Sequence, residues 1–213
     1  MARKTRKDAR ETRAAILDAA LRIFLEQGVA RTSLAEIARE AGVTRGAIYW
    51  HFENKADLLN ALWDEVRLPF EPLALAGVQE DEPNPLERER ELFSCVFEGL
   101  REGSRQRQLF QLIHSKCEMV GETEAILQRR ISDYINGLAR LEKVLTNSVA
   151  KGQLPPHFDA RLGALFIFTL IDGMITFSLT VPQCIHLDED VPKLLDGMFR
   201  MLQLVPRLEN PPD

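Results

Sequence analysis

The chain has 213 residues, which is enough for one medium-sized domain or two small ones. With 45% hydrophobic and 28% charged residues, its composition is typical of a globular protein and excludes a disordered chain. The net charge of −5 argues against a nucleic-acid binder, but the charge is unevenly distributed. Residues 1–67 carry 12 Lys and Arg against 10 Asp and Glu, and the first 13 residues carry six basic groups against two acidic ones. This asymmetry predicts a nucleic-acid-facing N-terminal part on an acidic body.

The cysteines and the N-terminus indicate the compartment. Cys95, Cys117 and Cys184 are odd in number and far apart, which favours reduced thiols over a disulfide framework. The basic N-terminus is followed by no apolar signal region, so we expect no secretory leader. Both features predict a cytoplasmic protein.

One apolar segment, residues 162–181, is about long enough to cross a bilayer. Asp172 lies at its middle, where a charge is costly in lipid, and no basic cluster flanks one side. A helix that is apolar all round is also the pattern of a fully buried helix. We therefore expect a buried helix and no membrane partner.

Helical periodicity runs through nearly the whole chain, and no convincing alternating strand pattern is present, so the sequence predicts an all-α fold. Pro69 and Pro72 are expected to disturb the fourth helix, and residues 79–85 form an acidic, proline-containing loop. The predicted helices cover approximately residues 7–27, 34–41, 45–52, 55–68, 86–102, 105–117, 122–151, 160–181 and 189–205.

Capping residues set the bounds of the first four helices. Gly28 and Gly42 are well placed to end the first and second helices. Ser33 with Glu36 forms a capping box for the second helix, and Thr44 caps the third. Asn54 with Asp57 caps the fourth in the same way. Two short helices separated by a tight turn are therefore expected between residues 33 and 52.

This helix–turn–helix segment, TSLAEIAREAGVTRGAIYWHFENK, has the character of a DNA reader. With Ile48 and Phe52 facing inward, the helical period places the remaining residues of the third helix on an outer arc. Arg45 can bind guanine in bidentate fashion, and Gly46 and Ala47 allow close approach to bases. Phosphate contacts are expected from Tyr49, from His51, from Lys55 and from the start of the second helix. The predicted DNA-binding residues are Thr32, Ser33, Thr44, Arg45, Gly46, Ala47, Tyr49, Trp50, His51 and Lys55.

The competing interpretation is an ordinary helical hairpin with an aromatic surface. Tyr49, Trp50 and His51 are consecutive on a short helix and cannot all face a core. They would form an exposed aromatic patch that needs a partner, which favours the DNA reader.

The motif TSLAEIAREAGVTRGAIYWHFENKADLL resembles the signature of the TetR family of bacterial transcription regulators almost residue for residue. The start MARKTRKDARETRAAILDAALRIF, the phrase VTRGAIYWHF and the later HSKCE and FRMLQL resemble its AcrR branch, whose members repress multidrug efflux-pump genes. The resemblance implies a helix-turn-helix DNA-binding domain over residues 1–53. It also implies an all-α ligand-binding and dimerisation domain over residues 54–213, with a small-molecule inducer and no cofactor. The family's DNA contacts match Thr32, Ser33, Thr44, Arg45, Gly46, Tyr49, His51 and Lys55.

Two polar residues on apolar helix faces are candidates for the inducer site. Asp172 shares a stripe with Leu165, Phe168, Ile175 and Leu179. It is either a polar anchor for cationic or hydrogen-bonding ligands, or a buried aspartate bonded to a neighbouring helix or across the dimer. His114 lies at the edge of an apolar face, where a structural role is common; the resemblance favours a pocket. The candidate ligand-binding residues are Leu92, Phe93, Val96, Phe110, His114, Phe168, Asp172 and Ile175, any of which can equally be plain core.

The last two helices are the expected dimer interface. Gly163 and Gly173 permit close packing, and the final helix has too many apolar residues for a surface helix with one buried side. A two-fold homodimer would present two recognition helices to a pseudo-palindromic double-stranded operator.

Three other classes of protein were weighed. An enzyme is disfavoured because no phosphate loop, dinucleotide fingerprint, nucleophile elbow or paired-histidine zinc helix is present. A metal or redox sensor on the same scaffold rests on His114, Cys117 and Glu118, which share a helix face; ordinary helices produce such triplets by chance, and we predict no metal. Cys95 and Cys184 have no basic sequence neighbours to activate a thiolate. A purely structural dimerisation module leaves the exposed face of residues 45–51 unexplained.

Overall fold

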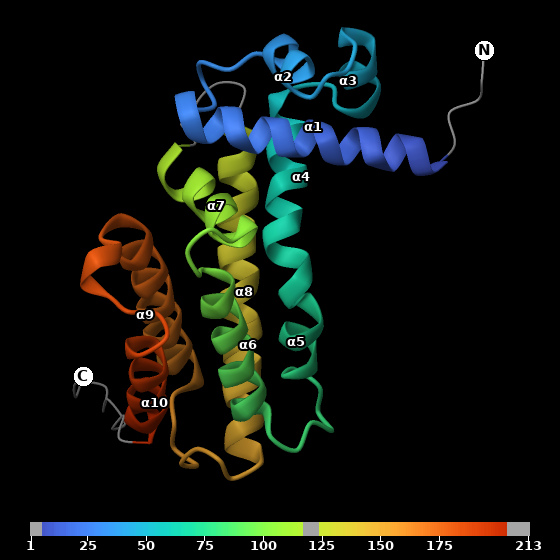
Figure 1. Ribbon diagram of the computed structural model, residues 1–213. Coiled ribbons are helices and arrows are strands. Elements are labelled where there is room, and N and C mark those ends of the chain that lie inside the picture. The colour runs from blue at the N-terminus through green and yellow to red at the C-terminus, as the bar shows by residue number, and fades with distance from the viewer. Residues whose placement is uncertain (1–5, 117–123, 204–213) are drawn as a thin grey trace, which may run out of the picture. The chain divides into compact units, whose positions relative to one another are not determined.

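The computed structural model describes residues 6–116 and 124–203, and these residues form helices without any strand (Figure 1). The all-α prediction is confirmed. The α-helices are α1 (Arg6–Gln27), α2 (Leu34–Glu40), α3 (Arg45–His51), α4 (Lys55–Arg67), α5 (Glu71–Ala76), α6 (Pro85–Gly99), α7 (Arg105–Gln111), α8 (Glu124–Ala150), α9 (Ala160–Thr180) and α10 (Asp190–Leu202). Shorter elements are the 3-10 helices η1 (Leu68–Phe70) and η4 (Pro182–Cys184) and the π-helix η2 (Leu112–Lys116).

Contacts divide the described residues into two compact units. The first unit contains residues up to Arg67 and from Gly103 to Ile131, so α7 and the start of α8 belong with α1–α4. The second unit contains Leu68–Glu102 and the chain from Ser132 onward. This division by contacts differs from the expected division by function after residue 53, because α4 and the segment around α7 pack with the N-terminal helices. The functional boundary stays a prediction.

The core of the first unit is built where α1 meets α2, α3 and α4. Figure 1 shows α2 and α3 together beside α1, and all three pairs of these helices are in contact. Ile16, Phe24, Ile37 and Ile48 have no solvent exposure. Full burial of such a side chain is worth about 1.5–3 kcal/mol relative to exposure, so this cluster fixes the positions of α2 and α3.

The region after α4 differs from the prediction. The fourth helix ends at Arg67 and is followed by η1 and by α5, a helix that the sequence pattern did not predict. Pro72 occupies one of the first positions of α5, where its missing N–H is not needed by the helix. The predicted helix 105–117 is also divided, since α7 ends at Gln111 and η2 follows.

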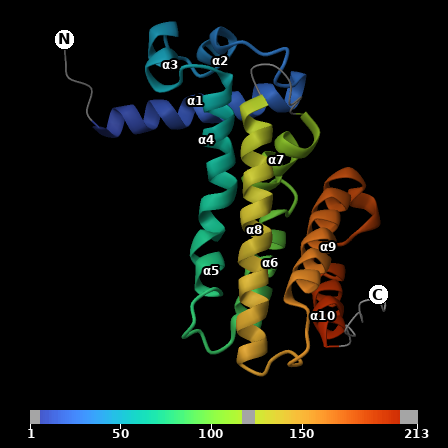
Figure 2. The ribbon, with the colours of Figure 1, turned by 180° about the vertical axis from the view of Figure 1, so that it is seen from behind.

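Helices α5, α6, α9 and α10 and most of α8 make up the second unit (Figure 2). Two glycines leave room for aromatic rings: a Cβ at Gly163 of α9 would lie 2.4 Å from the ring of Phe158 in the preceding loop, and one at Gly137 of α8 would lie 3.1 Å from the Phe168 ring of α9. Gly163 therefore packs within its own chain, whereas Gly173 is exposed and would meet nothing within 4 Å.

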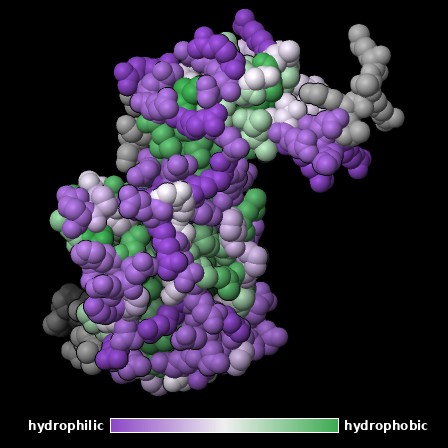
Figure 3. All heavy atoms as spheres, in the orientation of Figure 1, coloured by the Kyte–Doolittle hydropathy of each residue, from purple (hydrophilic) through white to green (hydrophobic). Residues whose placement is uncertain are grey.

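Helix α9 has a mean hydropathy of 1.9 over its most apolar window and is long and apolar enough to cross a membrane by these measures alone. Only 39% of that window is buried within the chain. The expected burial of α9 is therefore incomplete in the single chain. The exposed part of α9 around Phe177 is called its outer side below. The face shown in Figure 3 carries small hydrophobic patches among hydrophilic side chains.

Candidate nucleic-acid interface

The turn between α2 and α3 sets the direction of the candidate recognition helix. Gly42 has a φ of 66°, a left-handed conformation that favours glycine, and the Val43 N–H donates to the Ala38 carbonyl at 2.9 Å. The Thr44 hydroxyl then accepts a hydrogen bond from the Ala47 N–H at 3.1 Å, as a helix N-cap does. These contacts fix where α3 begins, and they confirm the predicted turn and cap.

The two sides of α3 differ sharply in burial. Ile48 is fully buried and Phe52 is 3% exposed, so both anchor the helix to α1 and α2 as predicted. On the other side Tyr49 is 46% exposed and Trp50 is 73% exposed. The two neighbouring aromatic side chains together form an exposed patch that no part of the described chain covers.

The outer side of α3 also combines charge with free space. The Arg45 guanidinium lies 5.8 Å from the centroid of the Tyr49 ring, so the ring supports the cation while its donors stay exposed. Gly46 is exposed, and a Cβ added there would meet nothing within 4 Å. Among the described residues, therefore, no neighbour requires glycine at this position, and the space in front of it is open.

His51 and Arg13 each make a ring contact at the end of α3. The His51 ring is half-buried and meets the Trp50 ring edge-on at 4.5 Å. The Arg13 guanidinium of α1 lies 5.1 Å from the centroid of the Phe52 ring. This second contact was not predicted, because α1 and α3 are brought together only by the fold.

Three predicted DNA contacts at the start of α2 and α4 are engaged in the chain's own hydrogen bonds. Thr32 is 3% exposed, and its hydroxyl donates to the Gly28 carbonyl at 2.8 Å. Ser33 forms the predicted capping box with Glu36, which occupies the Ser33 N–H at 2.8 Å. The Lys55 ammonium donates to the Val29 carbonyl at 3.3 Å. In this geometry Thr32 holds the loop between α1 and α2, and its hydroxyl is not available to a phosphate.

The capping box also changes the acidity of Glu36. Hydrogen bonds from the Ser33 hydroxyl, and next from its backbone N–H, lower the pKa of Glu36 below its ordinary value. The carboxylate is thus ionised and bound to the N-cap of α2, where it occupies the Ser33 N–H and hydroxyl and places a negative charge at the start of the helix.

The candidate ligand-binding residues fall into both units. Phe110 and His114 belong to the first unit, and the other six belong to the second. Leu92, Phe93, Phe110 and Ile175 are buried, while Val96, His114, Phe168 and Asp172 are half-buried. No ligand role is tested by this placement, so all eight assignments stay predictions.

Asp172 makes a hydrogen bond to a neighbouring helix, as one of its two interpretations expected, but with a partner that the sequence did not indicate. It accepts a hydrogen bond from the Tyr134 hydroxyl of α8 at 2.8 Å, and the Tyr134 ring meets the Phe168 ring edge-on at 5.4 Å. A tyrosine at the middle of a long amphipathic helix gives no local signal of such a role. Asp172 therefore has a partner on a neighbouring helix and still keeps part of its surface accessible.

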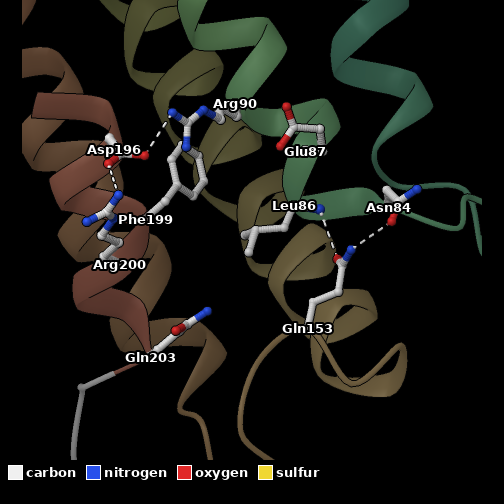
Figure 4. A pocket seen from close by; sticks show the side chains of 9 residues that line it. All are labelled: Asn84, Leu86, Glu87, Arg90, Gln153, Asp196, Phe199, Arg200 and Gln203. Carbon is white, nitrogen blue, oxygen red and sulfur yellow. Dashed lines mark hydrogen bonds and ion pairs between the residues drawn. The ribbon is translucent and has the colours of Figure 1, made fainter. Parts of the chain in front are cut away.

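A cavity of about 440 Å³ lies between the start of α6 and α10, and it contains none of the predicted ligand residues (Figure 4). On one side Asp196 binds both Arg90, at 3.0 Å, and Arg200, at 2.8 Å. On the other side the Gln153 side chain accepts from the Leu86 N–H at 3.2 Å and donates to Asn84 at 3.2 Å. Within each wall these polar groups thus bind one another, and the Arg90–Asp196 pair joins α6 to α10.

A more apolar groove of about 590 Å³ lies between α9 and α10. It is lined by residues that include Gly173, Phe177 and Leu194, and Phe177 and Leu194 are 48% and 44% exposed. These residues lie on the helices that the sequence assigned to a dimer interface.

No group of three potential metal ligands occurs within residues 6–116 and 124–203. Cys117 and Glu118 of the predicted triplet lie outside the described residues, so that alternative is not tested. Cys95 is half-buried and Cys184 is exposed, and both are free thiols.

Comparison with known proteins links these features to one family. The model of the tetR family of bacterial regulatory proteins matches residues 16–62, and that of the C-terminal region of MAATS-type transcriptional repressors matches residues 84–204. The HTH-type transcriptional regulator TtgR of Pseudomonas putida is 43% identical over 210 residues, which cover 99% of this chain and 100% of that protein. The regulator AcrR of Shigella flexneri is 37% identical over 211 residues, covering 99% and 98%.

Solved structures agree with the sequence comparison. NalD, the secondary repressor of the MexAB-OprM multidrug efflux pump in Pseudomonas aeruginosa, superimposes with a TM-score of 0.81 at 34% identity, over 92% of this chain and 97% of that one. A complex of SmeT with triclosan gives a TM-score of 0.82 at 29% identity, over 95% and 99%. SmeT is the repressor of the SmeDEF multidrug efflux pump of Stenotrophomonas maltophilia.

Proposed function

The chain belongs to the TetR family of bacterial regulatory proteins, and we propose that it is a DNA-binding repressor of multidrug efflux-pump genes, released from its operator by small hydrophobic or cationic ligands. The observation that carries the proposal is the outer side of α3. Its exposed Arg45, Tyr49 and Trp50 stand on a helix that Ile48 anchors in the core. NalD and SmeT, which are repressors of multidrug efflux pumps, share this architecture over nearly the whole chain.

In this proposal the N-terminal half of α3 reads base edges in the major groove. Arg45 recognises guanine, and the open space at Gly46 lets the helix backbone approach the base pairs. Phosphate and sugar contacts, or close packing on the groove, are assigned to Thr44, Ala47, Tyr49, Trp50 and His51, and to Lys55, whose ammonium has donors beyond its bond to Val29. We assign Ser33 to positioning of α2, because its N–H and its hydroxyl both donate to Glu36. We assign Thr32 to positioning, because its hydroxyl is bonded to Gly28.

The proposed assembly is a homodimer formed through the outer side of α9 and through α10. Phe177 and Leu194 are exposed large apolar residues, and a second copy covers them. Such a cover accounts for an apolar α9 in a cytoplasmic protein without a membrane. The two recognition helices then read a pseudo-palindromic operator with half-sites roughly 34–36 Å apart, or a multiple of this.

The proposed ligand site uses Asp172 as its polar anchor. The Tyr134 hydroxyl orients the carboxylate, and the neighbouring Phe168 ring offers apolar contact to a bound molecule. Release follows from two states: the ligand prefers a state in which the recognition helices no longer match the operator spacing. Operator binding and ligand binding must then weaken each other by the same factor.

The proposal is tested by mobility shift of the purified protein on its own upstream intergenic DNA, across a salt series. We expect tight, salt-sensitive binding by the wild type and its loss in Arg45→Ala. Arg161→Ala is the matched control, since it removes an exposed arginine from the start of α9 in the second unit. If Arg45→Ala and Arg161→Ala lost DNA binding equally, the effect would come from overall charge. That result would contradict the assignment of α3 as the recognition helix.

A further inference from the structure

Arg105 connects two helices of the first unit that are distant in sequence. It stands at the start of α7, and its Nη1 atom lies 2.6 Å from the Asp18 carboxylate in α1. Its Nε atom lies 2.7 Å from the Glu65 carboxylate in α4. One guanidinium group thus binds α1 and α4 at once, which its planar fork of donors allows and a point charge does not.

Neighbouring side chains hold α4 from the same direction. The Gln106 amide donates to the Glu65 carbonyl at 3.4 Å. Arg129 of α8 donates to the Asn60 side chain at 2.9 Å and also binds Asp64. The side of α4 that carries these acceptors is therefore bound by α7 and by the start of α8, all within the first unit.

Helix α7 and η2 also carry two of the candidate ligand-binding residues. Phe110 is the last residue but one of α7, and His114 lies within η2; their rings are 6.2 Å apart. Both α7 and η2 are in contact with α1, and α7 is in contact with α4. A displacement of α7 consequently changes the position of the Arg105 side chain relative to Asp18 and Glu65.

We propose that Arg105 is a positioning residue for operator recognition, which holds α1 and α4 in the arrangement that DNA binding requires through the Asp18–Arg105–Glu65 clamp. This inference rests on the proposed function. Arg105 touches no candidate DNA-contacting residue and acts on α3 through α1 and α4, which both pack against the first unit's core. Helix α7 and η2 carry the candidate ligand-binding residues Phe110 and His114. A ligand that displaces α7 would therefore act through Arg105 on α1 and α4.

The charges of the clamp determine what its loss does. Hydrogen bonding to Glu65 raises the pKa of Arg105, so the group remains a cation at every physiological pH. Its side chain is 42% exposed, and solvent screening therefore keeps the clamp modest in strength. Without the guanidinium, Asp18 and Glu65 are left as two neighbouring carboxylates that repel each other and separate α1 from α4.

The first measurement compares wild type with Arg105→Gln for binding to operator DNA and to unrelated DNA by fluorescence anisotropy. The operator is the sequence that wild-type protein selects from a random pool. We expect Arg105→Gln to bind the operator about 2- to 25-fold more weakly, because the loss of one partly exposed ion pair is worth about 1.4- to 5-fold and Arg105 makes two such pairs. Affinity for unrelated DNA stays within about twofold, because non-specific binding needs phosphate contacts and no fixed helix arrangement. A merely structural role would lower the melting temperature without changing this ratio of affinities.

Two further variants separate positioning from general charge effects. Adding Asp18→Asn to Arg105→Gln removes the carboxylate repulsion, and we expect it to restore part of the operator affinity, giving a non-additive double-mutant cycle. Arg101→Gln is the control, since Arg101 pairs with Asp188 at 3.0 Å in the second unit. It should leave both DNA affinities unchanged.

The outcomes are distinct. Specific operator binding by wild type together with an unchanged affinity ratio in Arg105→Gln would overturn the clamp and leave the proposed function standing. Strict additivity of Asp18→Asn and Arg105→Gln would equally contradict the clamp. A wild-type protein that selects no sequence and binds all DNA alike would remove the proposed function, and the clamp's role with it.

Discussion

Gly46 is the residue where fold and function make opposite demands. Glycine inside a helix costs roughly 0.5–1 kcal/mol relative to alanine, and no neighbour in the chain requires its small size. We expect Gly46→Ala to raise the free energy of unfolding by up to about this amount. We also expect Gly46→Ala to weaken operator binding. Gly46→Leu should weaken operator binding at least about tenfold, because the larger side chain would occupy the space that a base pair takes in the complex. Urea denaturation and anisotropy on the same samples measure both effects; an operator affinity that rises with stability would contradict the assigned approach of α3.

Asp172 carries the second residue-scale prediction, because its carboxyl group and its hydrogen bond to Tyr134 can be removed separately. Asp172→Asn removes the charge, and Tyr134→Phe removes the hydrogen-bond donor while the carboxylate remains. If Asp172 anchors ligands, Asp172→Asn should lower affinity for a cationic dye about tenfold and leave a neutral hydrophobic compound nearly unaffected. Tyr134→Phe should affect the two compounds alike. Calorimetry with both compounds decides; equal losses for both in Asp172→Asn would assign the residue to structure alone.

The capping box of α2 gives a pH prediction at the scale of the element. The pKa of Glu36 is lower in the folded chain than in the unfolded one, so unfolding takes up a proton in acid. The contribution of Glu36 to stability is complete above its unfolded pKa and is lost as the pH falls through its folded pKa. Glu36→Gln should remove this part of the acid dependence, as followed by urea denaturation between pH 3 and about 7. A carboxyl titration of Glu36 at its ordinary pKa by NMR would show that the box is absent in solution.

Elements with local signals were predictable, and those set by tertiary contacts were not. Gly42, Thr44 and the Ser33–Glu36 pair marked the bounds of α2 and α3, since their hydrogen bonds span only a few residues. Helix α5 was missed because Pro72 reads as a helix breaker in sequence, although it is compatible with a first turn. The π-helix η2 interrupts a regular apolar pattern without any marker residue.

The same distinction between local signals and tertiary contacts explains which parts of the candidate sites were predictable. The outward direction of Arg45 and Tyr49 followed from helical periodicity, because Ile48 fixes which side is buried. The burial of Thr32, the Tyr134–Asp172 hydrogen bond and the Arg105 clamp join residues from different elements. No spacing in the sequence indicates such partners; they depend on how the helices meet.

For the whole molecule, the outer side of α9 predicts the oligomeric state. Phe177→Glu places a charge on this exposed apolar face, and we expect it to convert the dimer to a monomer and to weaken operator binding at least about tenfold, since one half-site is then lost. Leu75→Glu is the matched control, because Leu75 is 52% exposed on α5, away from α9. Sedimentation velocity measures the mass; a dimer that persists in Phe177→Glu would place the interface elsewhere.

The central claim is that DNA and ligand weaken each other's binding to the dimer. Calorimetry that compares ligand binding to free dimer and to operator-bound dimer tests it most directly. The ligand is a compound that releases the operator in a mobility-shift screen, and it is titrated into free dimer and into dimer saturated with operator. Linkage requires operator-bound dimer to bind the compound more weakly by the same factor by which the compound weakens operator binding, typically about 5- to 150-fold. Equal affinities for the free and the DNA-bound dimer would contradict a repressor that its ligand switches off.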